Sequence, residues 1–397
     1  MSTALINPRI RGFLCLTSHP AGCAANVRRQ VDLAKAGGPG KGLGNVLIIG
    51  SSAGFGLASL ITTVFGHGAK ALSVAFERPG QGDKPGSAGW YNLAEVHRLA
   101  KAEGRQVESI IGDAFSGPIL EQAITALRER FGKIDTLVYS LASPKRTDPA
   151  TGLTHGSTLK PIGAPYTGQT VDLDTDVIKA VTIQPAVPED IINTEKVMGG
   201  EDWERWVEAL IAADLLAPGF RTVAYSYIGP AMTHAIYRDG TIGRAKMHLE
   251  GSANRLDQKL QKAVGGHAWI SVNKALVTQA SSAIPVVPLY ISLLYKTMKA
   301  NGSHEGTIEQ IIRLFRDHLA PNHSPVLDAN RRIRVDDWEM REENQAAVAS
   351  LWPQVTTENL LDISDYAGFK HEFRTLFGFE LDGVDYNLPV EVEVPLV

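Results

Sequence analysis

Residues 45–61 place an apolar strand, a glycine-rich turn and the start of a helix in direct succession. The strand, 45–50 (NVLIIG), runs into a turn that carries Gly50, Gly54 and Gly56. Glycine adopts the positive φ that a tight strand-to-helix turn needs, and it lets a phosphate approach the backbone. The free amides at the helix start favour the same anion. The residues predicted to bind a dinucleotide here are Gly50, Ser51, Ser52, Ala53, Gly54, Phe55 and Gly56.

The same strand-then-helix pattern recurs along the chain. Short apolar runs typical of strands buried on both faces occupy 71–77, 107–112, 134–140 and 221–228, with a sixth near 269–272. Between them, 57–65, 91–103 and 119–131 have apolar residues at helical spacing. Strands alternating with helices of this length indicate right-handed βαβ units. The expected fold is α/β, a Rossmann-type doubly wound parallel sheet.

We expect one long insertion within this core, and extensions at its N- and C-terminal ends. The stretch between the fourth and fifth strands exceeds the length of an ordinary βα connection, and it is rich in Pro, Gly and Thr. We expect a single elaborated domain over 1–397. Its Rossmann core comprises 45–143 and 220–300, its insertion or substrate lid 144–219, and its C-terminal helical extension 301–397.

The carboxyl ends of the strands carry the other expected cofactor contacts. Glu77 closes the second strand, where an acid accepts hydrogen bonds from the adenosine ribose hydroxyls. A carboxylate there repels a 2′-phosphate and so favours NADH over NADPH, although Arg78 directly follows. The carboxyl ends of parallel strands share one edge of the sheet, so they form one nucleotide crevice. The predicted residues at these ends are Phe76, Glu77, Asp113, Ala114, Leu141 and Ala142.

A tyrosine and a lysine follow the fifth strand with eight residues between them. At about 100° per residue, nine steps would put Tyr237 and Lys246 on opposite faces of one continuous helix. A shared site therefore requires Tyr237 to precede the helix. Asp239, Gly240 and Thr241 supply breaking and capping chemistry for a helix that starts near position 241.

These motifs resemble one family over essentially the whole chain. The segments 8–13 (PRIRGF), 50–56, 140–144 (SLASP) and 273–285 (NKALVTQASSAIP), with the Tyr-x8-Lys pair, are similar to the FabV-type trans-2-enoyl-acyl-carrier-protein reductases and the trans-2-enoyl-CoA reductases. The resemblance implies NADH-dependent reduction of the 2,3 double bond of an enoyl thioester. Tyr237 and Lys246 are the implied catalytic residues and Tyr227 a substrate contact. The implied nicotinamide contacts are Leu276, Val277 and Thr278.

The substrate carrier stays open at this point. The expected substrate is an enoyl thioester of acyl carrier protein, and the alternative is an enoyl-CoA of short-chain metabolism. A short-chain alcohol dehydrogenase or ketoreductase is a weaker alternative, because its Tyr–Lys spacing is normally shorter. A regulator that senses nucleotide without turnover would not need the Tyr237–Lys246 pair.

Composition argues against several other classes of protein. With 39 Lys and Arg against 43 Asp and Glu, the net charge of −4 gives no basic excess for nucleic-acid binding. Two cysteines, Cys15 and Cys23, and dispersed histidines give no metal-ligand spacing. No secretory signal or span long enough for a bilayer stands out. We expect a cytoplasmic protein without membrane insertion or metal, and the resemblance implies a monomer.

Overall fold

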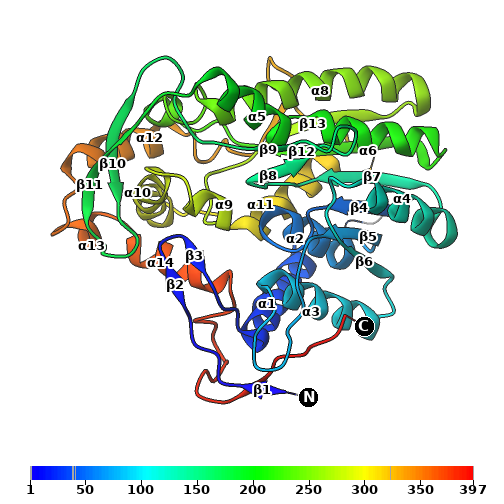
Figure 1. The fold of residues 1–397 in the computed structure, drawn as a ribbon, viewed down its shortest axis with the longest axis horizontal. Coiled ribbons are helices and arrows are strands. Elements are labelled where there is room, and N and C mark those ends of the chain that lie inside the picture. The colour runs from blue at the N-terminus through cyan, green and yellow to red at the C-terminus, as the bar shows by residue number, and fades with distance from the viewer. Residues whose placement is uncertain (1, 38–39, 41, 322, 397) are drawn as a thin grey trace.

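The fold centres on a parallel sheet of seven strands. The computed structural model describes residues 2–37, 40, 42–321 and 323–396. All neighbouring strand pairs are parallel, in the order β14-β13-β12-β7-β4-β5-β6 (Figure 1). This confirms the predicted doubly wound α/β class. The strands are β4 (Asn45–Ile49), β5 (Lys70–Ala75), β6 (Val107–Ile111), β7 (Ile134–Tyr139), β12 (Leu216–Ser226), β13 (His267–Val272) and β14 (Arg332–Arg334).

Helices cover both faces of the sheet because the central strand is apolar on both. In β4, Leu47 and Ile49 pack into one apolar cluster, whereas Val46 and Ile48 pack into the other, as the two-residue period of a strand requires. The first face is covered by α4 (Gly117–Ala126), α6 (Glu201–Ala212) and α8 (Thr241–Val264). The second is covered by α1 (Pro20–Ala36), α2 (Gly54–Ile61), α3 (Ala88–Ala102) and α11 (Thr307–Leu314).

A third apolar cluster surrounds α10 (Val287–Ala300), which lies beyond one end of the sheet (Figure 1). All apolar side chains of this helix from Val287 to Tyr295 are buried. They are enclosed by α12 (Glu342–Leu351), α14 (Tyr366–Thr375) and the hairpin of β10 (Tyr166–Val171) and β11 (Ile178–Ile183). The C-terminal segments therefore support α10.

Two of the expected segments outside the core make contact with the sheet. We expected residues 144–219 to form an insertion, but α6 within them packs on the sheet through Trp203 and Trp206, which are fully buried. We expected 301–397 to be a helical extension, yet β14 extends the sheet and α11 packs against α2. The part of 144–219 outside the core comprises two hairpins, β8–β9 (Lys145–Thr147, Thr154–Gly156) and β10–β11, and α5 (Pro188–Met198).

The two ends of the described chain meet. The strand β1 (Thr3–Ala4) pairs antiparallel with β15 (Val390–Glu391), and both ends lie near α3 (Figure 1). Elsewhere, no helix in the described ranges has both the length and the apolar character needed to cross a membrane.

Candidate active site

The turn between β4 and α2 is built so tightly that its glycines are required. Gly50 has φ +84°, and a Cβ there would lie 2.1 Å from the carbonyl oxygen of Ser140 on the neighbouring strand end. A Cβ on Gly56 would lie 1.8 Å from the carbonyl oxygen of Gly50. The residue before α2, Ala53, has no side-chain group to cap the helix. The first-turn amides of α2 therefore remain available to an anion, which fits the pyrophosphate of a dinucleotide.

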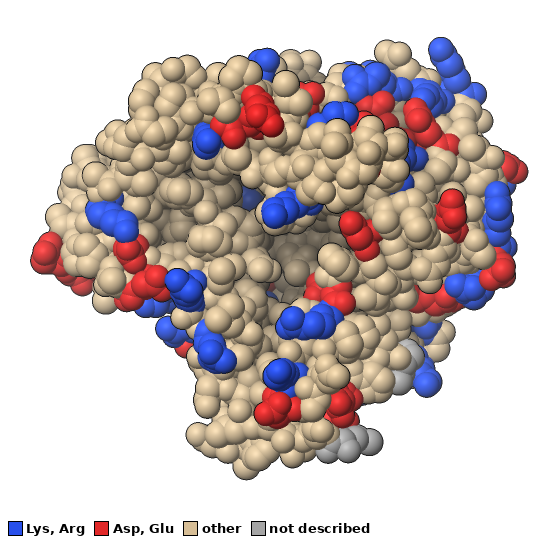
Figure 2. All heavy atoms as spheres, in the orientation of Figure 1, with Lys and Arg blue, Asp and Glu red and all other residues tan. Residues whose placement is uncertain are grey.

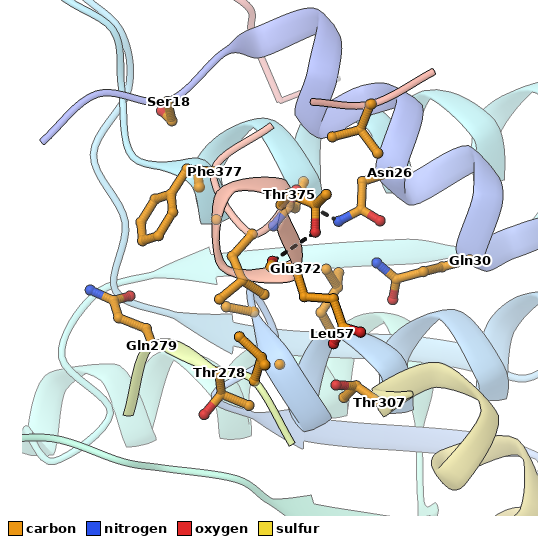
Figure 3. Close-up of a pocket in the computed structure, with 18 of the residues that line it drawn as sticks. Ser18, Asn26, Gln30, Leu57, Thr278, Gln279, Thr307, Glu372, Thr375 and Phe377 are labelled. Carbon is orange, nitrogen blue, oxygen red and sulfur yellow. Dashed lines mark hydrogen bonds between the residues drawn. The ribbon is translucent and has the colours of Figure 1, made fainter. Parts of the chain in front are cut away.

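A cavity of about 800 Å³ opens beside this turn (Figure 3). Five of the predicted cofactor residues line it: Ala53, Gly54, Glu77, Val277 and Thr278. The opposite wall comes from α1, the start of α11 and the segment after α14. Figure 2 shows the molecule hollowed near the centre of one face, with basic and acidic side chains around the opening. The cavity joins the predicted phosphate turn to the predicted nicotinamide loop.

The strand-end residues differ in what their side chains contact. Glu77 accepts a hydrogen bond of 2.5 Å from the Ser52 hydroxyl, beside the cavity. Phe76 is 78% exposed, so its ring is open to a flat ligand such as adenine. Asp113 accepts from the amide of Phe115 at 3.0 Å and stabilises its own turn.

Other predicted cofactor residues are held by the core. The buried hydroxyl of Ser51 donates to the carbonyl of Val74, 3.3 Å away. Ala114 is buried, and its carbonyl accepts from Arg205 and Trp206. Phe55 packs on the ring of Tyr225, and Leu141 packs on the apolar cluster under α4, whereas Ala142 is exposed.

The loop after β13 is also ordered by internal contacts. The amide of Val277 donates to the hydroxyl of Tyr295 at 3.1 Å. Thr278 caps the short helix α9 (Gln279–Ser282) by accepting from the amide of Ser281. The carbonyl of Leu276 accepts from the Ser281 hydroxyl. This loop is therefore preorganised at the cavity wall.

Tyr237 precedes the long helix, as predicted. It lies in turns between α7 (Ala231–His234) and α8, which begins at Thr241 with Gly240 as its N-cap. The Tyr237 carbonyl accepts from the amides of Gly240 and Gly243, so the chain doubles back sharply before the helix. Lys246, in the second turn of α8, donates to the carbonyl of Tyr225 at 3.1 Å.

Burial sets the protonation of this pair. It raises the pKa of the Tyr237 hydroxyl above its usual value and lowers the pKa of Lys246 to about 8. At neutral pH the tyrosine is therefore a protonated donor and the lysine is mostly an ammonium. Within the described part of the chain, the Tyr237 hydroxyl has no hydrogen-bond partner.

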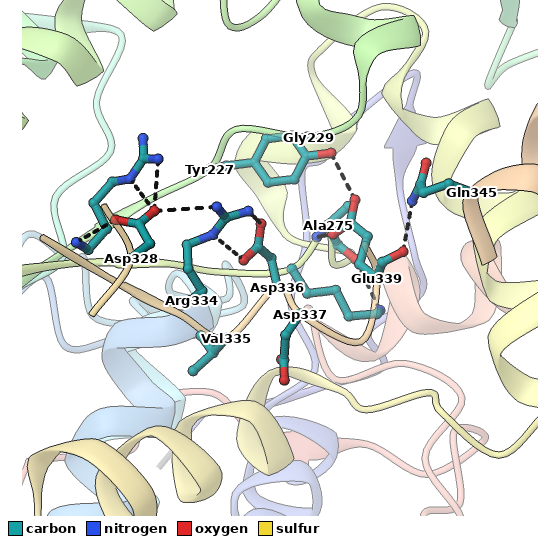
Figure 4. Close-up of polar contacts among 12 residues, drawn as sticks. Tyr227, Gly229, Ala275, Asp328, Arg334, Val335, Asp336, Asp337, Glu339 and Gln345 are labelled. Carbon is teal, nitrogen blue, oxygen red and sulfur yellow. Dashed lines mark hydrogen bonds and ion pairs between the residues drawn. The ribbon is translucent and has the colours of Figure 1, made fainter. Parts of the chain in front are cut away.

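The structure adds one buried residue, Glu339, that the sequence did not reveal. Tyr227 follows β12, and its hydroxyl donates to Oε1 of Glu339 at 3.2 Å (Figure 4). The two residues are separated by 112 positions. No local spacing or motif marks Glu339, so only the tertiary fold brings it to the site.

A parallel sheet with a glycine turn beside a cavity of about 800 Å³ is the arrangement of a nucleotide-dependent oxidoreductase of the Rossmann class. Tyr237 is buried and Lys246 is half-buried at the end of β12, and neither is among the described residues that line this cavity. Three family models match the chain: the NAD(P)H binding domain of trans-2-enoyl-CoA reductase at 5–82, the trans-2-enoyl-CoA reductase catalytic region at 84–320, and an enoyl reductase FAD binding domain at 327–390. The chain belongs to the trans-2-enoyl-CoA reductase family. This confirms the resemblance and the predicted nicotinamide cofactor.

Relatives match the chain over almost its full length. An enoyl-[acyl-carrier-protein] reductase [NADH] of Cytophaga hutchinsonii is 55% identical over 392 residues, which is 99% of each chain. The trans-2-enoyl-CoA reductase of Treponema denticola, solved with NAD, has a TM-score of 0.95 and 45% identity over 99% of this chain and 100% of that one. The Clostridium acetobutulicum enzyme, solved with NADH, has a TM-score of 0.95 and 42% identity over 98% of each chain.

Residues 327–390 do not fit a flavin, despite the description of the matching family model. Among the described residues of this segment, no strand leads through a glycine turn into a helix. A Cβ on Gly368 would meet the Asp365 carboxylate, and Gly378 packs on the backbone of α1. The apolar side chains of α12 and α14 are packed around α10. The segment supports α10 and, at the end of α14 and after it, forms part of the cavity wall, and we assign no flavin to it.

Proposed function

We propose that this protein is an NADH-dependent reductase of the 2,3 double bond of trans-2-enoyl thioesters. The observation that carries the proposal is the position of Tyr237. Its ring is buried against Tyr227, just after the strand whose Tyr225 carbonyl holds Lys246, and its hydroxyl has no hydrogen-bond partner in the described chain. Family membership over the whole chain supports the same reaction.

When bound, NADH supplies the hydride that adds to C3 of the enoyl group. Negative charge then develops on the thioester oxygen as an enolate. A Tyr237 hydroxyl aimed at that oxygen donates its hydrogen bond most strongly when the charge is greatest, so it lowers the barrier. The same hydroxyl is our proposed source of the proton that completes the saturated product.

The other residues bind and orient. We assign Lys246 to the nicotinamide ribose hydroxyls, where its positive charge also favours a more acidic Tyr237. Glu77 would accept hydrogen bonds from the adenosine ribose. The amides of residues 53–56 would hold the pyrophosphate.

A direct test compares the wild type with Tyr237→Phe. NADH oxidation is followed by absorbance with crotonyl-CoA, and NADH binding is measured separately. We expect wild-type turnover and a fall of about 10²–10³-fold in kcat for the variant, the usual cost of removing one oxyanion donor. NADH affinity should be kept. Equal activity of both proteins would exclude Tyr237 as the donor and point to Tyr227. Binding of NADH without turnover by either protein, with crotonyl-CoA and with the same acyl chain on acyl carrier protein, would refute the substrate assignment.

The physiological carrier is our finer proposal. We propose acyl carrier protein, since curated relatives at 51–55% identity carry enoyl-[acyl-carrier-protein] reductase names. The family models and the solved relatives, named for trans-2-enoyl-CoA, favour CoA as the second candidate. Matched C4 to C10 enoyl chains on the two carriers decide between them through kcat/KM.

The cellular compartment and the oligomeric state are two further proposals. Cys15 and Cys23 are both free thiols, as is usual in a reducing compartment, and we propose that the protein acts in the cytoplasm as a monomer. Sedimentation or light scattering at the mass of 42.8 kDa would support the monomer. A mass of twice that value would refute it.

A further inference from the structure

Glu339 is a fully buried carboxylate held by three donors. Its Oε1 accepts from the hydroxyls of Tyr227 at 3.2 Å and Tyr290 at 2.7 Å, and its Oε2 accepts from the amide of Ala275 at 2.7 Å (Figure 4). Buried carboxylates need such donors and a nearby cation. Burial raises the pKa of Glu339, whereas the Tyr290 and Ala275 donors and the buried Lys274 favour its ionised form. This environment stabilises one fixed carboxylate position.

The donors come from distant parts of the chain. Tyr227 follows β12, Ala275 follows β13, and Tyr290 lies on α10. Gln345 on α12 closes the group by donating to the Tyr290 hydroxyl at 3.1 Å and to the Glu339 carbonyl at 2.8 Å. Glu339 thus connects the C-terminal segment to the ends of two adjacent strands of the sheet.

Tyr227 connects this carboxylate to the proposed proton donor. The rings of Tyr227 and Tyr237 meet edge to face, with centroids 5.0 Å apart and planes at 75°. The position of the Tyr227 ring therefore restricts the position of the Tyr237 ring. Because the Tyr227 hydroxyl already donates to Glu339, it is a poor competitor for the thioester oxygen.

The two tyrosines also differ as acids. Burial, and then the Glu339 carboxylate, raise the pKa of Tyr227 well above its usual value. Burial alone raises the pKa of Tyr237. Geometry and charge therefore agree that the Tyr237 hydroxyl gives up its proton more readily than the Tyr227 hydroxyl.

We propose that Glu339 is a positioning residue of the reduction: by holding the Tyr227 hydroxyl, it fixes the ring against which Tyr237 packs and leaves Tyr237 to meet the substrate. This inference rests on the proposed function. It gives residues 327–390 a part in the active site through Glu339 rather than through a flavin.

A double-mutant cycle tests the proposal. Glu339→Gln keeps the size of the side chain and removes its charge, and Tyr227→Phe removes the hydroxyl. Both are assayed with crotonyl-CoA, alone and combined. We expect each to lower kcat by about 10–100-fold through displacement of Tyr237, with KM and NADH affinity nearly unchanged. The double variant should be no slower than the slower single one, because both break the same link.

Tyr366→Phe is the matched control. It removes another tyrosine-to-carboxylate hydrogen bond, 2.8 Å to Asp176, that involves neither Tyr227 nor Tyr237. We expect it to lower the melting temperature and leave kcat near the wild-type value. A kcat loss of the same size in the control and in Glu339→Gln would make the role of Glu339 purely structural and overturn the proposal.

The remaining outcomes are separable. Losses in kcat that multiply in the double variant would mean that Glu339 does not act through Tyr227, which overturns the inference while the proposed function stands. If Glu339→Gln does not fold, Tyr227→Phe decides alone, and an unchanged kcat overturns the inference. If the wild type binds NADH but reduces crotonyl groups on neither CoA nor acyl carrier protein, the proposed function fails, and the inference with it.

Discussion

At the scale of single residues, burial makes Lys246 sensitive to pH near neutrality. Its pKa of about 8 lies below the usual value for lysine, so its ammonium is lost as the pH rises through 8. If it holds the nicotinamide ribose, NADH affinity should be full at pH 7 and fall by about 10–100-fold by pH 9.5, the worth of hydrogen bonds from a charged donor. Fluorescence titration of NADH across this range measures the effect.

Lys246→Arg provides the control for that prediction. A guanidinium stays charged throughout the range. The NADH affinity of this variant should therefore be the same at pH 7 and at pH 9.5. A flat profile for the wild type as well would show that Lys246 does not bind the cofactor through its charge.

The same residues illustrate what local sequence can predict. The Tyr237–Lys246 spacing, together with Gly240, was enough to place the helix start at Thr241. Glu339 was out of reach because its partners, Tyr227 and Ala275, lie 112 and 64 positions away. Nor does a strand-end motif reveal where a side chain points, since the hydroxyl of Ser51 turns to the carbonyl of Val74. Its contact with the cofactor stays a prediction.

At the scale of elements, the β4–α2 turn depends on the absence of one Cβ. Gly56→Ala would place that atom 1.8 Å from the Gly50 carbonyl oxygen, so the backbone must move. We expect a loss of about 1–3 kcal/mol in the free energy of unfolding, measured with urea, and a clear loss of NADH affinity. Gly117→Ala, at the start of α4 with open space around its Cβ, should be neutral or stabilising. Unchanged NADH binding by Gly56→Ala would contradict the assignment of this turn.

The packing of the two segments outside the expected core also has a physical explanation at this scale. The amphipathic pattern of α6 predicted a helix, but it could not say that Trp203 and Trp206 face the sheet. The strand β14 has three residues, too few for a period of two to be recognised, and the helices α9, α10 and α11 separate it from β13 in the sequence. Its place at the sheet edge comes from its pairing with β13.

At the scale of the whole molecule, the C-terminal strand closes the chain onto its nucleotide-binding part. The carbonyls of Val392 and Val394 accept from Tyr91 and Trp90 of α3, and the Glu393 carboxylate accepts from the amide of Gly82. The Tyr91 hydroxyl also accepts from the amide of Gly86, which lines the cavity. Residues 392–394, the C-terminal tail, thus stabilise the loop that follows Glu77.

Removal of residues 390–397 should therefore affect both stability and cofactor binding. Burial of Val392 is worth about 1.5–3 kcal/mol, and each of the three lost hydrogen bonds adds about 1 kcal/mol, so we expect the free energy of unfolding to fall by roughly 4–6 kcal/mol. NADH affinity should weaken because the loop at Gly86 loosens, whereas kcat at saturating NADH should be kept, because Tyr237 and Glu339 do not contact the tail. Val392→Ala, which keeps the backbone hydrogen bonds, should cost less stability and preserve NADH affinity. Calorimetry and NADH titration of both variants measure these effects, and a truncated protein that binds NADH as the wild type does would refute this coupling.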